Sequence, residues 1–428
     1  MLPQLREIER RFAHEVAIVG VHSGKYPAER ETRRIRHAAI RLGNTHPIVN
    51  DRQFRIWRSY AVRAWPTLVV IDPNGAVLGT HAGEFTAEML APFLERAIAS
   101  FEATGELDRT SLTFRVDEPV VAPGLLAYPG KVAIDGDRMA VADTGHHRLL
   151  VGRLDEAGRR LRVEREIGGM HRGFADGARP TFDTPQGVLF DGDSLLVADS
   201  GNHAVRRVAL SSGSVTTLAG TGRRLRSRDG LGARELASPW DLALADDTLF
   251  VAMAGTHQLF AIDPVTGAMR IHCGSGAEEI HDGPHHEAAL AQPMGIVASG
   301  SRLWFVDAES SAVRWADIDV GGRVGTLTGT GLFDFGDKDG AGDEVRMQHQ
   351  QGLTRHPSGR LLVADSYNDA LKWVDPANCS ATTWRRGFHE PSGIAIGREL
   401  IYVADTNAHR IATVDEHSGE IETLEIAM

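Results

Sequence analysis

Cysteine is scarce in this chain of 428 residues, which contains only Cys273 and Cys379. The two cysteines lie 106 positions apart and form no CxxC spacing, so the sequence predicts neither a zinc site nor a disulfide framework. We expect two buried free thiols, no bound metal and no other cofactor.

Positive charge and long apolar runs are also scarce. The chain has 46 Lys and Arg against 57 Asp and Glu, a net charge of −11, and no basic cluster that could follow a nucleic acid backbone. No run approaches the roughly 18 apolar residues of a membrane span, and the first residues carry charges where a secretory signal needs an apolar core. We therefore expect a cytoplasmic protein that binds neither nucleic acid nor membrane.

The rest of the composition is that of a folded protein, with 42% hydrophobic and 24% charged residues. Within it, one short segment recurs six times, and its clearest copy, from Leu195 to Arg206, reads LLVADSGNHAVR. The aspartate of this segment, or the residue that replaces it, marks the copies at Asp143, Asp199, Met253, Asp307, Asp365 and Asp405. The marker spacings are 56, 54, 54, 58 and 40 residues, a period that fits one four-stranded blade with a loop.

Each repeat unit contains short β-rich runs that are separated by turn residues. A proline lies 14 residues before five of the markers, at Pro129, Pro185, Pro239, Pro293 and Pro391. Gln350 replaces it in the fifth unit, 15 residues before the marker. Four strands joined by tight turns form a blade that must stack on neighbours to bury both faces, and a closed ring removes the exposed ends. Six units therefore predict an all-β, six-bladed propeller.

These units resemble NHL repeats, whose motif combines a Pro-x-Gly start, a Val-Ala-Asp strand end and an Asn-His turn, as in Val197–His203. A second recurring element joins a Gly-x-Gly to a later Asp-Gly, as at Gly220, Gly274 and Gly329. In a propeller these loops and the Asn-His turns open onto the same face, which we expect to be the binding rim. We interpret the marker aspartates as turn caps.

The first 104 residues show a different pattern, of alternating helices and strands. It predicts a buried strand at 16–22, a helix at 29–42, a strand at 47–50 and a helix at 54–60. Strands at 67–72 and 76–80 and a helix at 86–100 follow. This order predicts an α/β domain at 1–104, a linker at 105–120 and the propeller at 121–428.

The segment Tyr60–Thr67, with Ile71–Gly75 and Gly83, resembles the thioredoxin superfamily. The resemblance implies that Pro66 is the cis-proline of the family and that Trp65, Pro66 and Thr67 face an extended peptide substrate. Pro66 could instead end a helix. The CxxC of the family and the central strand before it would lie upstream of residue 1, so we expect an incomplete domain. The combination resembles the NHL repeat-containing thioredoxin-like proteins.

Histidine occupies the same repeat position in four units, at His147, His203, His257 and His409, where the other two have Ser311 and Asp369. A metal or acid–base cluster is one interpretation, but a residue that repeats with the motif more often bonds its own turn or the neighbouring blade. Departures from the repeat are better candidates for specific function. They are Trp240, Asp241, Met253, Glu309, Tyr367 and the loop at 281–286.

Three functions remain open at this stage. The first is a scaffold whose propeller rim binds a protein or peptide. The second is a thiol-disulfide oxidoreductase whose CxxC lies upstream of this start, and the third is a metal-dependent propeller lyase or hydrolase, supported only by analogy of fold. The sequence contains no nucleotide-binding or hydrolase motif, identifies no catalytic residue and leaves the oligomeric state open.

Overall fold

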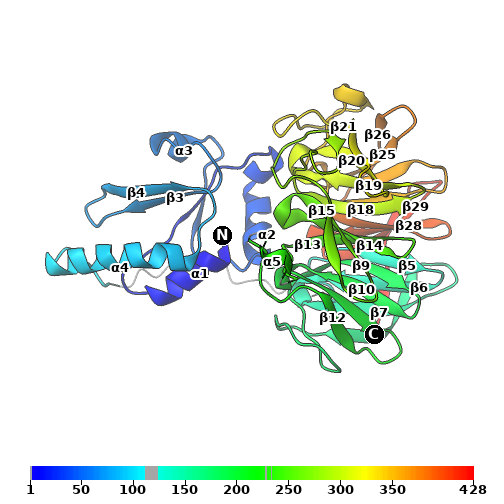
Figure 1. Ribbon diagram of the computed structural model, residues 1–428, viewed down its shortest axis with the longest axis horizontal. Coiled ribbons are helices and arrows are strands. Elements are labelled where there is room, and N and C mark those ends of the chain that lie inside the picture. Colours follow the sequence, from blue (N-terminus) through cyan, green and yellow to red (C-terminus); the bar gives the residue numbers. More distant parts are fainter. Residues whose placement is uncertain (1, 111–123, 227–228, 233) are drawn as a thin grey trace. The chain divides into compact units, whose positions relative to one another are not determined.

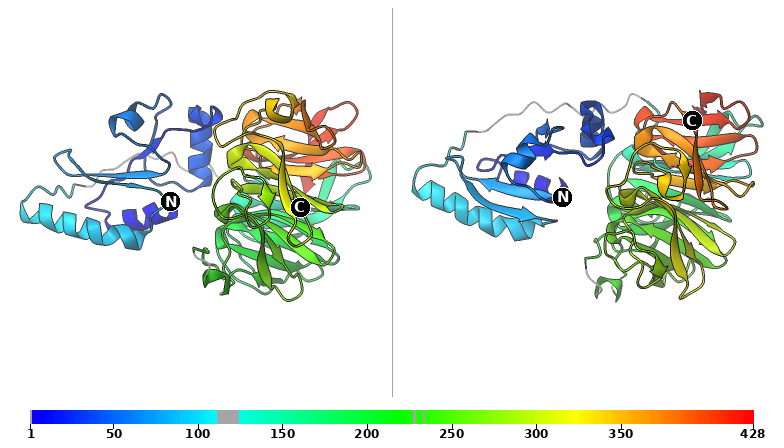
Figure 2. Two further views of the ribbon diagram at one scale, coloured as in Figure 1. Left: turned by 45° about the horizontal axis from the view of Figure 1, so that its top comes forward. Right: turned by 90° about the horizontal axis from the view of Figure 1, so that it is seen from above.

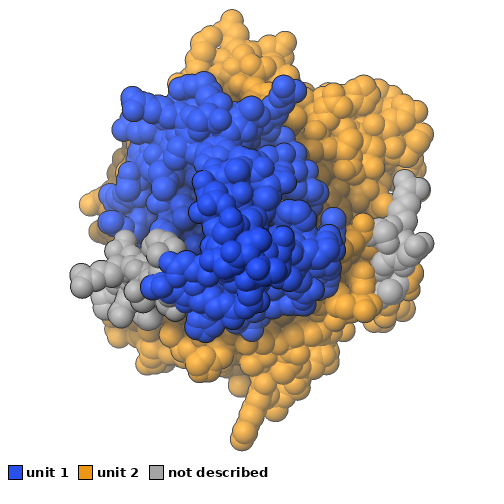
Figure 3. All heavy atoms as spheres, turned by 90° about the vertical axis from the view of Figure 1, so that its left-hand side faces the viewer, with its two compact units in different colours: residues 1–121 blue, residues 122–428 orange. Residues whose placement is uncertain are grey.

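A computed structural model describes residues 2–110, 124–226, 229–232 and 234–428 (Figure 1). The chain divides into two compact units, residues 1–121 and 122–428, which Figure 3 distinguishes by colour. The finer division at 104 and 120 stays a prediction, since residues 111–120 of the expected linker lie outside the described ranges. No helix in the described ranges is long and apolar enough to cross a membrane.

The first unit combines helices and short strands, and those between residues 28 and 103 lie close to the positions that the sequence predicts. Its helices are α1 (Leu2–Arg11), η1 (Ala28–Arg30), α2 (Thr32–Arg41), α3 (Arg55–Ser59) and α4 (Ala87–Ala103). Its strands are β1 (Gly20–His22), β2 (Ile48–Asn50), β3 (Thr67–Ile71) and β4 (Val77–Ala82). The side chain of Thr86 caps α4 by accepting a hydrogen bond from the N–H of Met89 (3.3 Å).

Within this unit the described residues form two separate strand pairs instead of one sheet. β1 pairs in parallel with β2, and β3 pairs in antiparallel with β4. The prediction of a buried strand at 16–22 is wrong, because β1 has only three residues and one neighbour, which leaves Val19 and Val21 about half exposed. The described residues therefore do not show the continuous sheet that the thioredoxin resemblance implies.

The small core of the first unit lies between α1 and α4, where Ile8 and Phe12 pack against Ala87, Ala91 and Leu94. The peptide bond between Trp65 and Pro66 is cis, as the resemblance implies.

Residues 124–428 form the six predicted blades, each an antiparallel sheet of four consecutive strands. Blade 1 has β5 (Val132–Asp135), β6 (Arg138–Asp143), β7 (Arg148–Leu154) and β8 (Arg160–Gly168). Blade 2 has β9 (Pro185–Asp191), β10 (Ser194–Asp199), β11 (Ala204–Ala209) and β12 (Val215–Ala219). Blade 3 has β13 (Pro239–Ala245), β14 (Thr248–Met253), β15 (Gln258–Ile262) and β16 (Met269–Cys273), preceded by α5 (Asp229–Gly232).

The remaining blades follow the same order. Blade 4 has β18 (Pro293–Ser299), β19 (Arg302–Asp307), β20 (Ala312–Asp317) and β21 (Arg323–Thr328). Blade 5 has β23 (Gly352–Arg355), β24 (Leu361–Asp365), β25 (Ala370–Asp375) and β26 (Ser380–Arg386). Blade 6 has β27 (Pro391–Ile396), β28 (Leu400–Asp405), β29 (Arg410–Asp415) and β30 (Ile421–Thr423). Every marker residue ends the second strand of its blade, as predicted. This includes Met253, which replaces the aspartate in blade 3.

The ring closes between blades 6 and 1, which lie side by side in both views of Figure 2. There β27 packs against β5, and β31 (Glu425–Ala427) leaves blade 6 to pair in parallel with β8 at 160–162. Leu424 therefore separates β30 from β31, at the point where the chain leaves blade 6 for the edge of blade 1.

Apolar clusters between successive blades form the core of the propeller. The second strands are buried along almost their whole length because a neighbouring blade covers each face. This burial accounts for near-continuous apolar runs such as Leu195–Ala198, where a half-exposed strand would alternate with polar residues.

Candidate functional site

The candidate site is the face of the propeller that carries the six turns between the second and third strands. We call this face the rim. The turns are η2 (Thr144–His146), η3 (Ser200–Asn202), η4 (Ala254–Thr256), η5 (Ala308–Ser310), η7 (Ser366–Asn368) and η8 (Thr406–Ala408). Each turn donates a backbone hydrogen bond to the segment that enters its own blade, as Gly201 does to the carbonyl of Asp183 (2.9 Å). The turns between the second and third strands therefore lie beside the loops that enter the blades, as the sequence predicts.

The residue after each turn binds the next blade. It has a left-handed backbone, with φ between 50° and 56°, and its side chain accepts a hydrogen bond from a backbone N–H of the following blade. The six pairs, donor first, are Thr184 and His147 (3.0 Å), Ser238 and His203 (3.0 Å), Gln292 and His257 (3.1 Å), His349 and Ser311 (3.3 Å), Glu390 and Asp369 (2.8 Å), and Tyr128 and His409 (3.1 Å).

The last of these bonds joins blade 6 to blade 1 and so helps to close the ring. The prediction that each repeated histidine bonds its turn or neighbour is confirmed for the neighbouring blade. Burial lowers the pKa of His203 to about 4, which keeps its ring neutral and able to accept. Within the described ranges, no group of three or more His, Cys, Asp or Glu side chains could hold a metal ion.

In blades 2, 4 and 5 a network of ion pairs joins the marker aspartate, a buried cation of the third strand and an aspartate of the incoming loop. In blade 4, Asp307 accepts hydrogen bonds from the N–H of Ala291 (2.8 and 2.9 Å) and pairs with Arg314 (2.8 Å). Arg314 also pairs with Asp282 of the incoming loop (2.9 Å), and Asp282 accepts from the N–H of Thr326 (2.9 Å).

The interpretation of the marker aspartates as turn caps holds only in part. Asp199 and Asp365 accept from the side-chain amides of the turn residues Asn202 and Asn368 but not from the turn backbone, and they also bind the incoming loop and a strand cation.

The same arrangement recurs with Asp199, Arg206 and Asp176 in blade 2, and with Asp365, Lys372 and Asp339 in blade 5. In blade 3 the acid and the cation are both replaced, by Met253 and Phe260, which are fully buried in one apolar cluster. The sulfur of Met253 accepts from the N–H of Ala237 (3.3 Å), where Asp307 accepts from Ala291 in blade 4. Blade 3 therefore lacks both the carboxylate and the cation of the network, so neither charge is buried there without its partner.

The propeller axis carries a second departure from the repeat. Two residues after the proline position, four blades have a glycine (Gly187, Gly295, Gly352, Gly393), whereas blade 1 has Lys131 and blade 3 has Asp241. Lys131 Nζ lies 3.3 Å from Asp241 Oδ2 and also donates to the carbonyls of Gln351 and Ser392. A side chain from blade 1 that reaches blades 3, 5 and 6 must lie on the axis.

The glycines make this arrangement possible. A Cβ on Gly352 would lie 3.0 Å from Lys131 Nζ and 1.8 Å from the carbonyl oxygen of Ser392, and a Cβ on Gly393 would lie 2.6 Å from Lys131 Cα. Burial lowers the pKa of Lys131 and raises the pKa of Asp241, and each charge opposes the shift of the other. The axis is therefore filled by an ion pair.

A third departure gathers on the rim of blades 4 to 6, in Glu309, His349, Tyr367 and Glu390. We call these four residues the rim cluster. His349 Nδ1 lies 3.5 Å from Glu309 Oε1, and its ring stacks on Tyr367 at 4.5 Å between centroids. Glu390 accepts from Gln351 (3.4 Å) and from Asn407 (2.5 Å). The cluster places the carboxylate of Glu309 beside two stacked rings, whereas Glu390 is buried at the boundary with blade 6.

The structure brings together some of the predicted site residues and not others. Glu309 and Tyr367 meet in the rim cluster, and Asp241 lies on the axis, whereas His147, His203, His257 and His409 each bind a different blade boundary. Trp240 is half-buried next to Asp241. Lys131, His349 and Glu390 were missed, although Lys131 is visible as a departure from Pro-x-Gly.

In the first unit, Trp65 is 47% exposed and donates its indole N–H to the carbonyl of Ser23 (2.8 Å). Its ring lies 4.5 Å from that of Trp57 between centroids. Pro66 follows it, and the hydroxyl of Thr67 donates to the carbonyl of Ala64 (2.7 Å). The predicted peptide-facing role of Trp65, Pro66 and Thr67 stays a prediction.

The two cysteines differ in environment. Cys273 is buried, and burial raises the pKa of its thiol to about 12, whereas Cys379 is half-buried. Because the thiolate is the reactive form, we expect one thiol to react with Ellman's reagent at pH 8 in the native protein and both after unfolding in guanidinium. A Cys379→Ser variant should lose the native reaction, and a fast-reacting Cys273 would contradict this assignment.

No family model matches the chain. It is 35% identical to NHL repeat-containing protein 2 of Gallus gallus, over 100% of this chain and 66% of that protein. It is 34% identical to Protein SUPPRESSOR OF QUENCHING 1, chloroplastic, of Arabidopsis thaliana, over 100% of this chain and 44% of that protein. A shorter match, 33% identical, covers 13% of this chain and 31% of Thiol-disulfide oxidoreductase ResA of Halalkalibacterium halodurans.

The chain spans just under two thirds of the length of the NHL repeat-containing relative. The identity over the whole chain agrees with the six repeats in the sequence and the six blades in the structure. The chain is therefore a homologue of the NHL repeat-containing proteins, with a six-bladed β-propeller.

Proposed function

We propose that the chain is an interaction scaffold whose propeller rim binds a protein or peptide. The observation that carries this proposal is the rim cluster, where Glu309, His349 and Tyr367 meet on one face. Residues that repeat in every blade hold the ring together, so they cannot give one part of the rim its own specificity. The rim cluster can give one part of the rim its own specificity, because its combination of side chains occurs at only one place in the described ring.

The chemistry of the rim cluster favours a particular kind of ligand. Glu309 supplies negative charge, and Tyr367 supplies an aromatic surface on the other side of His349. Carboxylates next to an aromatic ring suit a basic side chain, which gains both an ion pair and a cation–π contact. We therefore expect the ligand to present a lysine or arginine from an exposed segment, and we place this interaction in the cytoplasm.

A paired set of variants tests the proposal. Tyr367→Ala and Glu309→Gln should each weaken capture of the partner about tenfold, because they remove the ring or the charge that contacts it. Val320→Ser is the matched control, since Val320 is 79% exposed in the turn at the opposite end of blade 4. Quantitative pull-down from cells, followed by titration of the recovered partner, measures the effect. Equal loss in the control, or no loss in either rim variant, would contradict the proposal.

A thioredoxin-like redox role for the first unit is the second candidate. Its support is the order of helices and strands in that unit and the short similarity to a relative named as a thiol-disulfide oxidoreductase. The residues of this chain supply only Cys273 and Cys379, both in the propeller. In-frame codons for a CxxC in the DNA upstream of Met1 would support this candidate, and a stop codon with no such codons between would remove it.

No observation on the described residues favours a metal-dependent lyase or hydrolase, the third hypothesis from the sequence, over the scaffold.

A further inference from the structure

Two buried histidines, His272 and His285, lie side by side at the boundary between blades 3 and 4. Their ring centroids are 4.5 Å apart, and neither residue is more than 5% exposed. His272 belongs to β16, and His285 follows the short strand β17 (Gly283–Pro284) in the loop that enters blade 4. The loop at 281–286 departs from the repeat, and none of its residues belongs to the rim cluster.

A β-bulge directs His272 to this boundary. The register between β15 and β16 skips His272, as the registers of the matching strands skip Leu218 in blade 2 and Leu327 in blade 4. A bulge changes the direction of the extra side chain. Leu218 and Leu327 pack in the apolar clusters of their own boundaries. Blade 3 therefore places a titratable ring where blades 2 and 4 place an apolar side chain.

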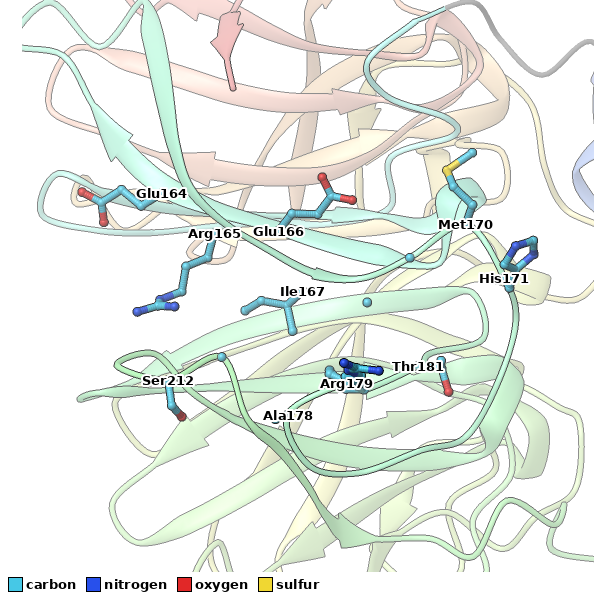
Figure 4. Close-up of a pocket in the computed structure, with 14 residues that line it drawn as sticks. Glu164, Arg165, Glu166, Ile167, Met170, His171, Ala178, Arg179, Thr181 and Ser212 are labelled. Carbon is cyan, nitrogen blue, oxygen red and sulfur yellow. The ribbon is translucent and has the colours of Figure 1, made fainter.

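His285 occupies a place that is open at another boundary. It lies three residues after Asp282 of its Asp-Gly element, and Arg179 lies three residues after Asp176 in the loop that enters blade 2. At the boundary between blades 1 and 2 this place is a groove of about 580 Å³, and Figure 4 shows Arg179 in its wall. The ring of His285 is instead buried beside a second imidazole.

The contacts of the pair suit two neutral rings. His272 Nε2 lies 2.9 Å from the carbonyl oxygen of Asp317, to which it donates, and His272 Nδ1 lies 3.3 Å from the guanidinium of Arg270 and accepts from it. Phe250 of β14 packs on the same ring at 4.8 Å between centroids. Neither ring nitrogen of His285 has a hydrogen-bond partner among the described residues. A proton added to either ring would thus lack an acceptor in the closed boundary.

The charged groups beside the pair are Arg270 on β16 and Asp317 at the end of β20. Asp317 already accepts a hydrogen bond from the N–H of Arg323 on β21 (3.0 Å). Burial lowers the pKa of His272 to about 4, and His285 and Arg270 add to that shift. Burial also lowers the pKa of His285, although the carboxylate of Asp317 opposes the shift. Both rings are therefore neutral at pH 7.

The backbone of His285 holds the loop to both blades. Its carbonyl accepts a hydrogen bond from the N–H of Gly274 at the end of blade 3 (2.9 Å), and its N–H donates to the carbonyl of Gly322 in blade 4 (3.0 Å). Further along the loop, the carbonyl of Ala291 accepts from the N–H of Glu309 in the rim cluster (2.9 Å). Movement of His285 would therefore break the contacts that fix the loop between the blades.

We propose that His272 and His285 form an acid-sensitive latch, and that their protonation releases the segment 281–289 from the boundary between blades 3 and 4. Release gives both rings access to water and moves His285 away from His272 and Arg270. The released form therefore binds more protons than the closed form, so its population must rise as the pH falls below the usual histidine pKa of 6.5. An effect on binding at the rim rests on the proposed function, whereas release of the segment does not.

Hydrogen exchange of chain 1–428 without a ligand measures the release. A histidine whose pKa is about 4 in the closed form and 6.5 in the released form shifts the equilibrium about twentyfold between pH 7 and pH 5. We therefore expect the protection factors of the amides at 281–289 to fall by about twentyfold or more over this range. Protection factors already include the correction for the intrinsic effect of pH on exchange.

The loop that enters blade 5 is the internal control. It pairs Asp339 with Lys372 as the blade 4 loop pairs Asp282 with Arg314, but Leu327 stands beside it in place of His272. Titration of the aspartates would loosen both loops, whereas titration of the histidines loosens only one. We expect the protection factors at 336–346 to stay nearly constant between pH 7 and pH 5.

Matched variants assign the effect to the two rings. His272→Leu copies the residue of blades 2 and 4, and together with His285→Leu it should remove the fall in protection at 281–289. Each single change should leave a smaller fall than the wild type shows. Unchanged thermal unfolding at pH 7 shows that the variants are folded. Constant protection in the wild type, an equal fall in the blade 5 loop, or an unchanged fall in the variants would each overturn the proposal.

Discussion

Replacing Asp307 by alanine is expected to lower the free energy of unfolding by about 3–5 kcal/mol. The change leaves the guanidinium of Arg314, which is fully buried, without the carboxylate that lies 2.8 Å away. It also leaves the N–H of Ala291 without its acceptor. Asp282 still pairs with Arg314, but its side chain is about half exposed, so it cannot replace the buried charge. Urea unfolding followed by tryptophan fluorescence measures the loss.

Blade 3 supplies the matched rescue for this variant. The double change Asp307→Met with Arg314→Phe copies the natural pair Met253 and Phe260, and we expect it to recover more than half of the lost stability. It removes the buried charges together, and the methionine sulfur can accept from the backbone N–H as Met253 does. Asp137→Ala, which breaks an exposed pair with Arg153, should leave the free energy of unfolding nearly unchanged, because solvent screens that pair. A double variant no more stable than Asp307→Ala would contradict this account.

The architecture of the propeller could be predicted because its information is local and repeated. Each marker ends a second strand, and each proline or its replacement lies at the start of a first strand, so six copies of one pattern define six blades. The cations behind the markers are less regular. Arg206, Arg314 and Lys372 follow their markers by seven residues, whereas Arg148 and Arg410 follow theirs by five, so no single spacing reveals all of them.

In the first unit the sequence predicted the positions of most helices and strands, but it did not predict how exposed the strands are. Strand positions follow from apolar runs such as 67–71, but burial depends on which strands lie beside them. Because β1 and β3 each have one neighbour among the described residues, runs that look like buried strands are half exposed. A sequence pattern cannot show how many neighbours a strand has.

The candidate site was predicted only where a residue breaks the repeat in its own blade. Glu309, Tyr367 and Asp241 stand out in this way. The partners of Glu309 and Asp241 are His349 and Lys131, which come from other blades, so these contacts form only when the blades assemble. Such contacts follow from the curvature of the ring, which the spacing of one repeat does not encode.

Loss of the axial ion pair is the second change with a large expected effect. Lys131→Met should destabilise the propeller by about 3–5 kcal/mol, because it leaves the carboxylate of Asp241 buried without a cation. The carbonyls of Gln351 and Ser392 also lose their donor. Asp241→Asn should cost a similar amount, and the double variant should cost less than the sum of the two, with a coupling of about 1–3 kcal/mol. Additive losses would show that the two groups do not interact.

The dependence on pH distinguishes a buried charge from a simple packing defect. In Asp241→Asn the carboxylate no longer raises the pKa of Lys131, so burial alone acts and lowers it further below the unfolded value of 10.5. The unfolded state then binds more protons than the folded state, and stability must rise with pH below that value. Because Asp241 makes the pKa of Lys131 less depressed in the wild type than in Asp241→Asn, we expect the difference between the two proteins to shrink as the pH rises below 10.5. Lys131→Met carries no titrating group at this position, so its deficit should not shrink in the same way, and parallel curves for both variants would mean that Lys131 is not charged on the axis.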